Sequence, residues 1–558
     1  MISMKSLFWT LLSTVVGGRA LTLPDGSVLL DATSDVNGRL WRPQVHFSPP
    51  SGFMNDPNGL HIDENGIYHL YYQYNPTCLT GGNQHWGHAT SQDLYHWVDQ
   101  PIAISPPDPN SLIWSGSAIV NVNNTSGLFS NQTNGVVAIY TLNNNTAGRQ
   151  VQEIAYSLDG GYTFTRYSGN PVINVNSNSF RDPKVFWHAA TQRWVVVVAH
   201  SNDLFLEIYT SPDLKNWTSV STFSRHGFLG FQYECPNLVR IPLRDASGAI
   251  IPTSDDTYVL TVSVSPGTPL GGSTIQYFPG TFNGSHFTPV DDATRFVDIA
   301  QDNYAAQFFY GLPDGDDALL LGWASNTAYT NLVPTAQEGW RGAHTIPRRL
   351  FLTNSGQGGW DLVSLPANIS AVFDPSPSGV IQNSFNGSGT VTVDLSAVTS
   401  NAYYFEVNVT GLQVAGPSVD GTDLGSTLAF TLSSPTTNES VSGGFLFGLG
   451  SAYLDRSHTN GFQIPLFTDK FSTTAGAVDG MWTLSAVWDR SILELFLGGG
   501  VQSATALAYP QEPLTQFTVN THAFSAGAVV NVTIYALESV WSGNGTRTIP
   551  TSPVIPLA

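Results

Sequence analysis

Short runs of apolar residues separated by turn residues occupy most of the chain. The runs GIYHLYYQY (66–74), RWVVVVAH (193–200) and TYVLTVSV (257–264) are rich in β-branched and aromatic side chains, which favour strands. Clusters of Gly, Asn, Asp and Pro stand between such runs and favour turns. Convincing helical periodicity does not appear, so the pattern predicts an all-β protein.

A short motif recurs in the first part of the chain. SQDLYHW (91–97), SLDGGYTF (157–164) and SPDLKNW (211–217) share a Ser, an Asp two residues later and an aromatic residue beyond it. Each follows a strand-like run, and successive copies begin 66 and 54 residues apart. A hairpin turn that recurs at this period predicts a β-propeller with one copy in a blade, although so short a pattern can also recur by coincidence.

The amino-acid composition of the chain changes near residue 365. The stretch LPANISAVFDPSPSG (365–379) is rich in Pro and Ser and predicts a linker, which we place at 366–380. Alternating strands such as NAYYFEVNVTG (401–411) follow and predict a β-sandwich over residues 381–558. The propeller is then assigned to residues 21–365. Two domains agree with a length of 558 residues, which is too great for one ordinary core.

The net charge and the cysteine content limit the functions that the protein can have. The formal net charge is −20, whereas nucleic-acid binding needs a basic face, so a nucleic-acid partner is disfavoured and a neutral substrate fits. The two cysteines, Cys78 and Cys235, could form a disulfide, but the sequence does not decide this. Neither a metal nor an organic cofactor is expected. The loop DATSDVNG (31–38) has acids at the wrong spacing for calcium, and three neighbouring histidines lack a partner cluster: His85, His88 and His96.

The N-terminus MISMKSLFWTLLSTVVGGRA (1–20) predicts a secretory signal peptide. Lys5 supplies a positive end, residues 6–17 are apolar, and small residues precede a cleavage site after Ala20. The apolar run is too short to span a bilayer, and no later segment is long enough, so no membrane association is expected. About a dozen Asn-x-Ser/Thr sequons follow, and they predict a secreted glycoprotein, extracellular or in the cell wall.

Three carboxylates stand beside strand-like runs of the first domain. Asp56 lies in FMNDPNG, Asp182 in SFRDPKVFW and Glu234 in FQYECPNL. Taken singly, each has a plain structural interpretation, because Asp-Pro favours turns and Glu can pair with a base. In a propeller, side chains from separate blades can meet in an axial pocket, where carboxylates divide into acid and base. Acetal cleavage needs such a division. NDPNG (55–59) is interpreted as a turn that fixes Asp56, and Arg181 is expected to keep Asp182 ionised.

The motifs MNDPNG, FRDPKVFW and YECPNL, in this order and spacing, resemble glycoside hydrolase family 32. This family comprises the β-fructofuranosidases, such as invertases and exo-inulinases, and the resemblance is closest to fungal secreted members. It runs from about residue 41 to the end and implies a five-bladed β-propeller followed by a β-sandwich. Further matching motifs are QYNP (73–76), WGHATSQDLYHW (86–97), WSGSA (114–118), DNYAAQ (302–307), GWRGAHTIPR (339–348) and WDRSILELF (488–496).

The resemblance implies a role for each carboxylate. Asp56 would be the nucleophile that attacks the anomeric C2 of a fructofuranosyl unit, and Glu234 the general acid and then the general base. Asp182 would hold fructose hydroxyls and stabilise an oxocarbenium-like transition state, with retention of configuration. A pocket-lining tryptophan of the family matches Trp323 only loosely. The resemblance also implies fructose-binding roles for Asn55, Gln73, Trp86, Ser115 and Arg181.

The expected activity is hydrolysis of terminal β-fructosides in sucrose or inulin-type chains. A fructosyltransferase would use the same carboxylates with a sugar acceptor, and a lectin would carry an inactive propeller, against which the three acidic motifs argue. An enzyme for arabinose or xylose is a third alternative, but NDPNG and the Glu-Cys pair favour fructose. Phe53, Tyr233 and Asn237 depart from common family residues, and we expect them near the leaving group, where they would affect substrate preference. The sandwich is expected to support the pocket rim or a homodimer contact.

Overall fold

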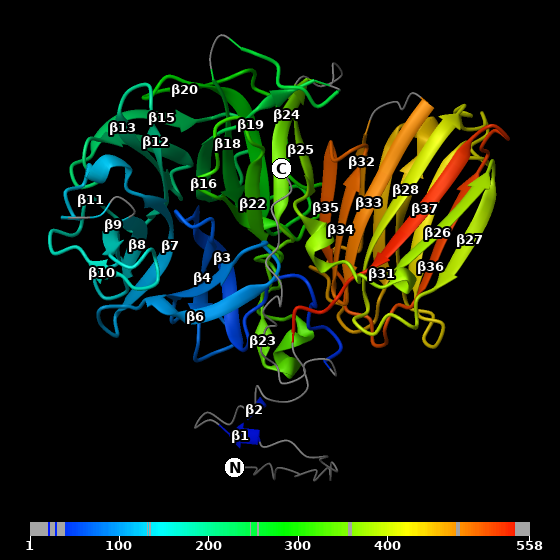
Figure 1. Cartoon of the computed structure of the whole chain (residues 1–558), viewed down its shortest axis with the longest axis horizontal. Helices are drawn as coiled ribbons and strands as arrows, with labels where there is room; N and C mark the ends of the chain where they lie inside the picture. The colour runs from blue at the N-terminus through cyan, green and yellow to red at the C-terminus, as the bar shows by residue number, and fades with distance from the viewer. Residues whose placement is uncertain are drawn as a thin grey trace, which may run out of the picture.

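Five sheets follow one another around a common axis in the first part of the chain, and two further sheets lie beside them (Figure 1). The computed structural model describes residues 20–22, 28–30, 39–130, 132, 135–245, 247–253, 256–354, 360–475 and 480–541. Within these ranges the chain forms strands and short 3-10 helices, and no α-helix. Residues 1–19 of the predicted signal peptide and the loop DATSDVNG lie outside the described residues. β1 (Ala20–Thr22) and β2 (Val28–Leu30) pair as a small ribbon.

Each of the five sheets is one blade of a β-propeller, and successive strands of a blade are mostly neighbours and antiparallel. Blade I contains β3 (Gly52–Ile62), β4 (Tyr68–Asn75), β5 (His85–Ser91), β6 (Trp97–Ile104) and the returning β23 (Trp340–Arg341). Blade II contains β7 (Ser111–Val120), β8 (Val136–Asn144), β9 (Arg149–Ser157), β10 (Thr165–Arg166) and β11 (Ile173–Ser177). Blade III contains β12 (Phe180–His188), β13 (Arg193–His200), β14 (Phe205–Ser211) and β15 (Thr218–Ser224).

The last two blades complete the ring, so the predicted five-bladed propeller is confirmed. Blade IV contains β16 (Tyr233–Arg240), β18 (Thr257–Val264), β19 (Thr274–Phe282) and β20 (Phe287–Pro289). Blade V contains β21 (Tyr304–Phe308), β22 (Ala318–Trp323), β24 (Arg348–Asn354), β25 (Trp360–Pro366) and β17 (Leu243–Arg244). The short 3-10 helices are η2 (Val122–Asn124), η3 (Pro334–Glu338), η4 (Ile369–Val372), η5 (Pro377–Gly379) and η6 (Phe447–Leu449).

The recurring Ser-x-Asp motif is the turn from the third to the fourth strand of blades I, II and III. In the first copy the Asp93 carboxylate accepts the backbone N–H groups of Tyr95 and His96. Asp213 does the same for Lys215 and Asn216 in the third copy. A carboxylate that satisfies two backbone donors holds the tight turn, which explains why the motif recurs at the blade period.

The innermost strands β3, β7, β12, β16 and β21 surround the channel and contact one another. Polar side chains cross the middle of the channel and bind backbone groups of other blades. Gln307 donates to the Gly116 carbonyl at 2.7 Å, Lys184 to the Phe308 carbonyl at 2.5 Å, and Asn237 to the Ala306 carbonyl at 2.8 Å. This layer divides the channel into two ends.

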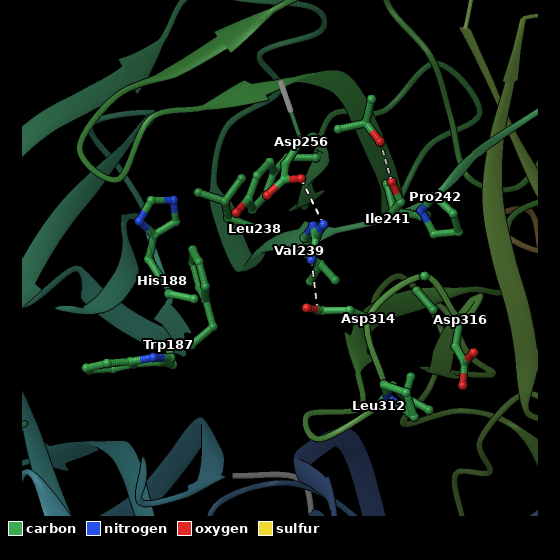
Figure 2. A pocket seen from close by; sticks show the side chains of 18 of the residues that line it. Trp187, His188, Leu238, Val239, Ile241, Pro242, Asp256, Leu312, Asp314 and Asp316 are labelled. Carbon is green, nitrogen blue, oxygen red and sulfur yellow. Dashed lines mark hydrogen bonds and ion pairs between the residues drawn. The ribbon is translucent and has the colours of Figure 1, made fainter. Parts of the chain in front are cut away.

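A cavity of about 440 Å³ opens at one end, lined by the last residues of β12 and β16. Arg240 forms ion pairs with Asp256 and Asp314 across it, each at 2.8 Å. Figure 2 shows the two aspartates in the cavity. The first residues of β12 and β16 face the opposite end of the channel, where the three predicted carboxylates lie.

The second domain is a β-sandwich of two six-stranded sheets, as predicted. Alternate residues of its strands point into one apolar core between the sheets. One sheet has the order β26 (Val380–Asn386), β37 (Val529–Ala536), β28 (Ala402–Leu412), β33 (Gly480–Asp489), β34 (Ile492–Leu497) and β35 (Gln502–Leu507). The other has the order β27 (Gly389–Asp394), β36 (Gln516–His522), β29 (Thr427–Ser433), β30 (Ser440–Leu446), β31 (Ser451–His458) and β32 (Lys470–Thr474).

Buried ion pairs join the two domains where the sandwich lies beside blade V (Figure 1). Arg348 of β24 binds Glu494 of β34, and both side chains are fully buried. His46, which precedes blade I, contacts Asp489 at 2.8 Å and Glu494 at 3.1 Å. Removal of one member would leave a buried charge unpaired, so this cluster couples the folding of the two domains.

Candidate active site

Every innermost strand of the propeller carries an irregularity of register at the same level of the channel. The shifts lie between Met54 and Pro57 in β3, Ile113 and Gly116 in β7, Arg181 and Lys184 in β12, Glu234 and Asn237 in β16, and Tyr304 and Gln307 in β21. A bulge adds a residue to one strand and changes the direction of its side chains. Five bulges at one level therefore direct side chains from all five blades to the same end of the channel.

The sequence NDPNG is part of this arrangement, and its interpretation as a turn is wrong. Residues 55–59 lie inside the continuous strand β3, with Asp56 at the bulge. A proline follows the bulged residue in three of the strands, as Pro57, Pro183 and Pro236. Proline has no N–H for a ladder bond, so it is tolerated at a bulge on the channel edge of a blade. Asp182 has φ +66° and Cys235 φ +44°, a conformation that costs energy outside glycine and often occurs at functional sites.

Asp56 and Asp182 approach each other from blades I and III, with Cys235 between them. The Cys235 thiol lies 3.4 Å from Asp56 Oδ2 and 3.6 Å from Asp182 Oδ2, and its N–H donates to Asp182 at 3.0 Å. Ser115 of blade II donates to Asp56 Oδ2 at 2.5 Å, and Asn55 donates to Oδ1 at 3.0 Å. Both oxygens of Asp56 are thus held in place. Cys78 is exposed, and no disulfide joins it to Cys235 in the described part of the chain.

Glu234 is fixed by two residues from other blades. Arg181 donates to Glu234 Oε1 through Nε at 3.1 Å and Nη2 at 2.9 Å. The Tyr304 hydroxyl donates to Oε2 at 2.5 Å. Sequence reasoning did not single out Tyr304, although it lies in the family motif DNYAAQ. The signal that could have identified it is its position at the start of an innermost strand, because the other blades carry their site residues at the corresponding position.

The electrostatics of the aspartates differ from the sequence expectation. Burial is the largest influence on Asp182 and raises its pKa to about 7; Arg181 opposes this shift, and the charges of Glu234 and Asp56 add to it. Burial also raises the pKa of Asp56, against the hydrogen bond from Ser115. The expectation that Arg181 keeps Asp182 ionised is therefore wrong. The physical reason is that the guanidinium binds Glu234 and does not outweigh the burial of Asp182.

The three carboxylates line a cavity of about 510 Å³ at this end of the channel. Of the other predicted site residues, Asn55, Gln73, Ser115 and Arg181 line it as well. Trp86 is fully buried behind the cavity, where its indole N–H donates to the Trp114 carbonyl at 3.1 Å. Trp114 itself lines the cavity. The remaining lining residues are Gly82, Gln84, Leu112, Gln150, Asn178, Asn202 and Gln232.

Buried polar atoms around the carboxylates lack a protein partner among the described residues. They are Asn55 Oδ1, Gln73 Nε2 and the indole nitrogen of Trp323. Trp323 packs edge-on against Phe53, with ring centroids 6.3 Å apart. Buried polar groups normally form hydrogen bonds, so these atoms are suited to the hydroxyl groups of a ligand.

Two of the three residues that depart from common family residues do not lie near a leaving group. Tyr233 is buried in the core between blades III and IV. Asn237 is buried in the channel layer, where its amide binds the backbone of β21. Phe53 contacts the site through a small apolar cluster with Tyr304, Trp323 and Cys235. The expected position of Tyr233 and Asn237 beside the leaving group is therefore wrong, whereas an effect on substrate preference stays a prediction.

Within the described ranges, no group of three His, Cys, Asp or Glu side chains is arranged to hold a metal ion. A helix of membrane-spanning length and apolarity is likewise absent from the part of the chain that the structure describes.

Known proteins match both domains. The profile described as Glycosyl hydrolases family 32 N-terminal domain matches residues 46–366, and that of Glycosyl hydrolases family 32 C terminal matches residues 378–536. An invertase of Schizosaccharomyces pombe is 39% identical over 521 residues, covering 90% of this chain and 86% of the relative. An extracellular exo-inulinase of Meyerozyma guilliermondii is 37% identical, covering 86% and 91%. A solved fructofuranosidase from Schwanniomyces occidentalis, complexed with fructose, has a TM-score of 0.80 at 35% identity, covering 90% and 99%.

Proposed function

Because the chain belongs to glycosyl hydrolase family 32, we propose that it is a β-fructofuranosidase that hydrolyses terminal β-D-fructofuranosyl units of sucrose and inulin-type fructans. The observation that carries this proposal is the meeting of Asp56, Asp182 and Glu234 in one cavity. They come from three different blades, and each is held by hydrogen bonds that fix its direction.

Asp56 is the proposed nucleophile. Its carboxylate attacks C2 of the fructosyl unit and forms an ester, while the bond from C2 to the leaving oxygen breaks. Glu234 gives its proton to that oxygen, and then takes a proton from the water that attacks C2 and releases Asp56. The two displacements together retain the configuration at C2. The hydrogen bonds from Ser115 and Asn55 support this assignment, because they orient Asp56 without a cation that would weaken it as a nucleophile.

Asp182 is proposed to hold fructose hydroxyls and to stabilise the oxocarbenium-like transition state. Its raised pKa leaves the carboxyl protonated at acidic pH, so it can both donate to and accept from hydroxyl groups. A proton there also limits the repulsion among three neighbouring carboxyls. The unpartnered atoms of Asn55, Gln73 and Trp323 would satisfy further hydroxyls of the same ring.

We also propose that the protein is secreted. The predicted N-terminal signal peptide and the sequons support this, as does the similarity to an extracellular exo-inulinase. A homodimer formed through the sandwich stays a prediction, which light scattering of the purified protein would decide.

The proposed nucleophile is tested by Asp56→Ala. This change is expected to reduce fructose release from sucrose about 10⁴-fold, because no covalent intermediate can form. Asp99→Ala, an exposed carboxylate on the outer strand β6, is the matched control and is expected to keep full activity. Retention is tested in methanol, where the unaltered enzyme should form methyl β-D-fructofuranoside. Hydrolysis that survives Asp56→Ala would overturn the nucleophile, and the α-product would overturn retention.

Equal release of glucose and fructose from concentrated sucrose separates the hydrolase from a fructosyltransferase. A transferase passes the fructosyl unit to another sugar, so free fructose would fall well below free glucose. That outcome would replace hydrolysis with transfer while keeping the three carboxylates in their roles.

A further inference from the structure

Phe231 is the most exposed aromatic side chain of the described residues, with 69% of its surface accessible. Single exposed apolar residues are common and need no explanation by themselves. The position of Phe231 is unusual, because it stands directly before Gln232, which lines the active-site cavity, and three residues before Glu234.

Strand direction places Phe231 on the face of the propeller where that cavity opens. β16 begins at Tyr233 on the carboxylate side of the channel, and its antiparallel neighbour β18 ends there at Val264. The segments before β16 and after β18 therefore lie together on this face. The Phe231 N–H donates to the Pro266 carbonyl at 3.1 Å, and the Ser265 N–H donates to the Gln232 carbonyl at 3.2 Å.

The phenyl ring is held against a glycine. Gly267 has φ +94°, and a Cβ built on it would lie 2.4 Å from a ring carbon of Phe231. The ring thus occupies the space that any other side chain would need. Ser265 binds Thr327 of blade V at 2.8 Å, which fixes the segment that carries this glycine. The phenyl ring is fixed by this packing and is still exposed to solvent. It can therefore bind a flat apolar surface without a further loss of side-chain conformational entropy.

The chemistry of the site says which part of a substrate would meet this ring. Glu234 protonates the leaving oxygen, so the leaving sugar lies on the Glu234 side of the cavity. Gln232 and Asn202 line this side and bind each other at 2.8 Å, so amide groups are available to the first leaving sugar. A second leaving sugar must lie farther out, beyond Gln232, where the phenyl ring stands.

We propose that Phe231 forms an outer subsite that stacks on the second sugar of the leaving group. The ligand class is inulin-type oligosaccharides of three or more units, since the leaving group of sucrose has one sugar only. The apolar face of a pyranose or furanose ring covers the phenyl ring and removes both surfaces from water. This inference rests on the proposed function, because it uses Glu234 as the acid.

The test compares sucrose with 1-kestose and nystose as substrates of the full-length protein. Phe231→Ala is expected to lower kcat/KM for the two oligosaccharides about tenfold through KM, with kcat nearly unchanged, because stacking contributes equally before and during the reaction. The kcat/KM for sucrose should change by no more than about twofold. Phe231→Tyr keeps the aromatic ring and should restore kcat/KM for the two oligosaccharides. Leu229→Ala, which removes another exposed side chain from the same segment, is the control and should change neither substrate.

The possible failures are distinguishable. If the unaltered protein released fructose from no substrate, the proposed function would fail, and the subsite with it. If hydrolysis were normal but Phe231→Ala left the ratio of kcat/KM for nystose to kcat/KM for sucrose unchanged, the subsite alone would be wrong. Equal losses on sucrose and nystose would also overturn it, since they would show a general disturbance of the cavity.

Discussion

Arg181 directs its guanidinium at Glu234, with Nη2 2.9 Å from Oε1, and not at Asp182, its neighbour in the chain. The contact crosses from blade III to blade IV. Both Nε and Nη2 meet the same oxygen, which leaves Oε2 for the Tyr304 hydroxyl. Arginine thus sets the direction of the proposed acid and compensates the burial of Asp182 only in part.

Arg181→Lys tests whether this orientation serves proton donation. A lysine keeps the positive charge but not the two fixed donors, so kcat/KM for sucrose should fall about 10–100-fold. The loss should shrink to a few-fold on an aryl β-fructofuranoside, whose leaving group needs no proton. Steady-state kinetics on both substrates measures the difference. Equal losses would mean that Arg181 acts on fructose binding and not through Glu234.

Tyr304→Phe removes the other partner of Glu234. Burial, followed by the charge of Glu234, raises the pKa of Tyr304 well above its ordinary value, so the hydroxyl remains a donor at any working pH. Loss of a hydrogen bond to a carboxylate is expected to lower kcat about 10–100-fold. Tyr310→Phe is the control, because Tyr310 lies in the next segment of the chain but lines the cavity at the far end of the channel. An unchanged kcat in Tyr304→Phe would remove Tyr304 from the catalytic machinery.

The fold could be predicted from local patterns because the propeller repeats them. The runs at 193–200 and 257–264 are β13 and β18 with the predicted bounds, and each Ser-x-Asp motif is a blade turn. The carboxylates could be found because each lies near the start of a strand that lines the channel. Local pattern and overall fold agree at these positions.

Contacts between blades could not be predicted, and they decide the details of the site. Asp-Pro favours a turn in isolation, but Asp56 lies in a strand because β4 and the channel impose a bulge there. Arg181 has a sequence neighbour of opposite charge, yet its partner is 53 residues away. The motif predicts Trp86 in the pocket, whereas its indole is fully buried and donates to the Trp114 carbonyl. In each case a partner distant in sequence overrides the local signal.

Asp182→Asn should stabilise the protein while reducing its activity. The pKa of Asp182 rises from 3.8 to about 7 on folding, so between these values the folded chain holds a proton that the unfolded chain releases. Stability contributed by this group therefore falls as pH rises through that window. The asparagine cannot ionise, so the variant should gain about 2–4 kcal/mol over the unaltered protein at pH 8 and little at pH 4. Chemical unfolding at both pH values measures this, with Asp99→Asn as the exposed control. A gain that does not grow with pH would contradict the buried charge.

Stability contributed by His46 at the domain junction also falls as pH rises, but for a different reason. Burial lowers the pKa of His46, but its hydrogen bonds to Asp489 and Glu494 and their charges outweigh burial and raise it from 6.5 to about 9. The charged form thus stabilises the junction fully below pH 6.5, and this contribution is lost as pH rises through about 9. Arg348 also binds Glu494, so the carboxylate keeps one partner after His46 loses its proton.

His46→Gln should therefore lower the free energy of unfolding by about 3 kcal/mol at pH 6 and much less at pH 10, which flattens the profile. Chemical unfolding followed by tryptophan fluorescence from pH 6 to pH 10 measures it. His522→Gln is the matched control, because His522 also pairs with an aspartate, Asp423, but lies on the surface with 59% of its side chain exposed. A surface pair is screened by water, so this variant should keep the profile of the unaltered protein. If His46→Gln showed the same slope as the unaltered protein, the charge on His46 would not help to hold the two domains together, and other buried pairs between them, such as Arg348–Glu494 and Arg456–Asp302, would have to do so.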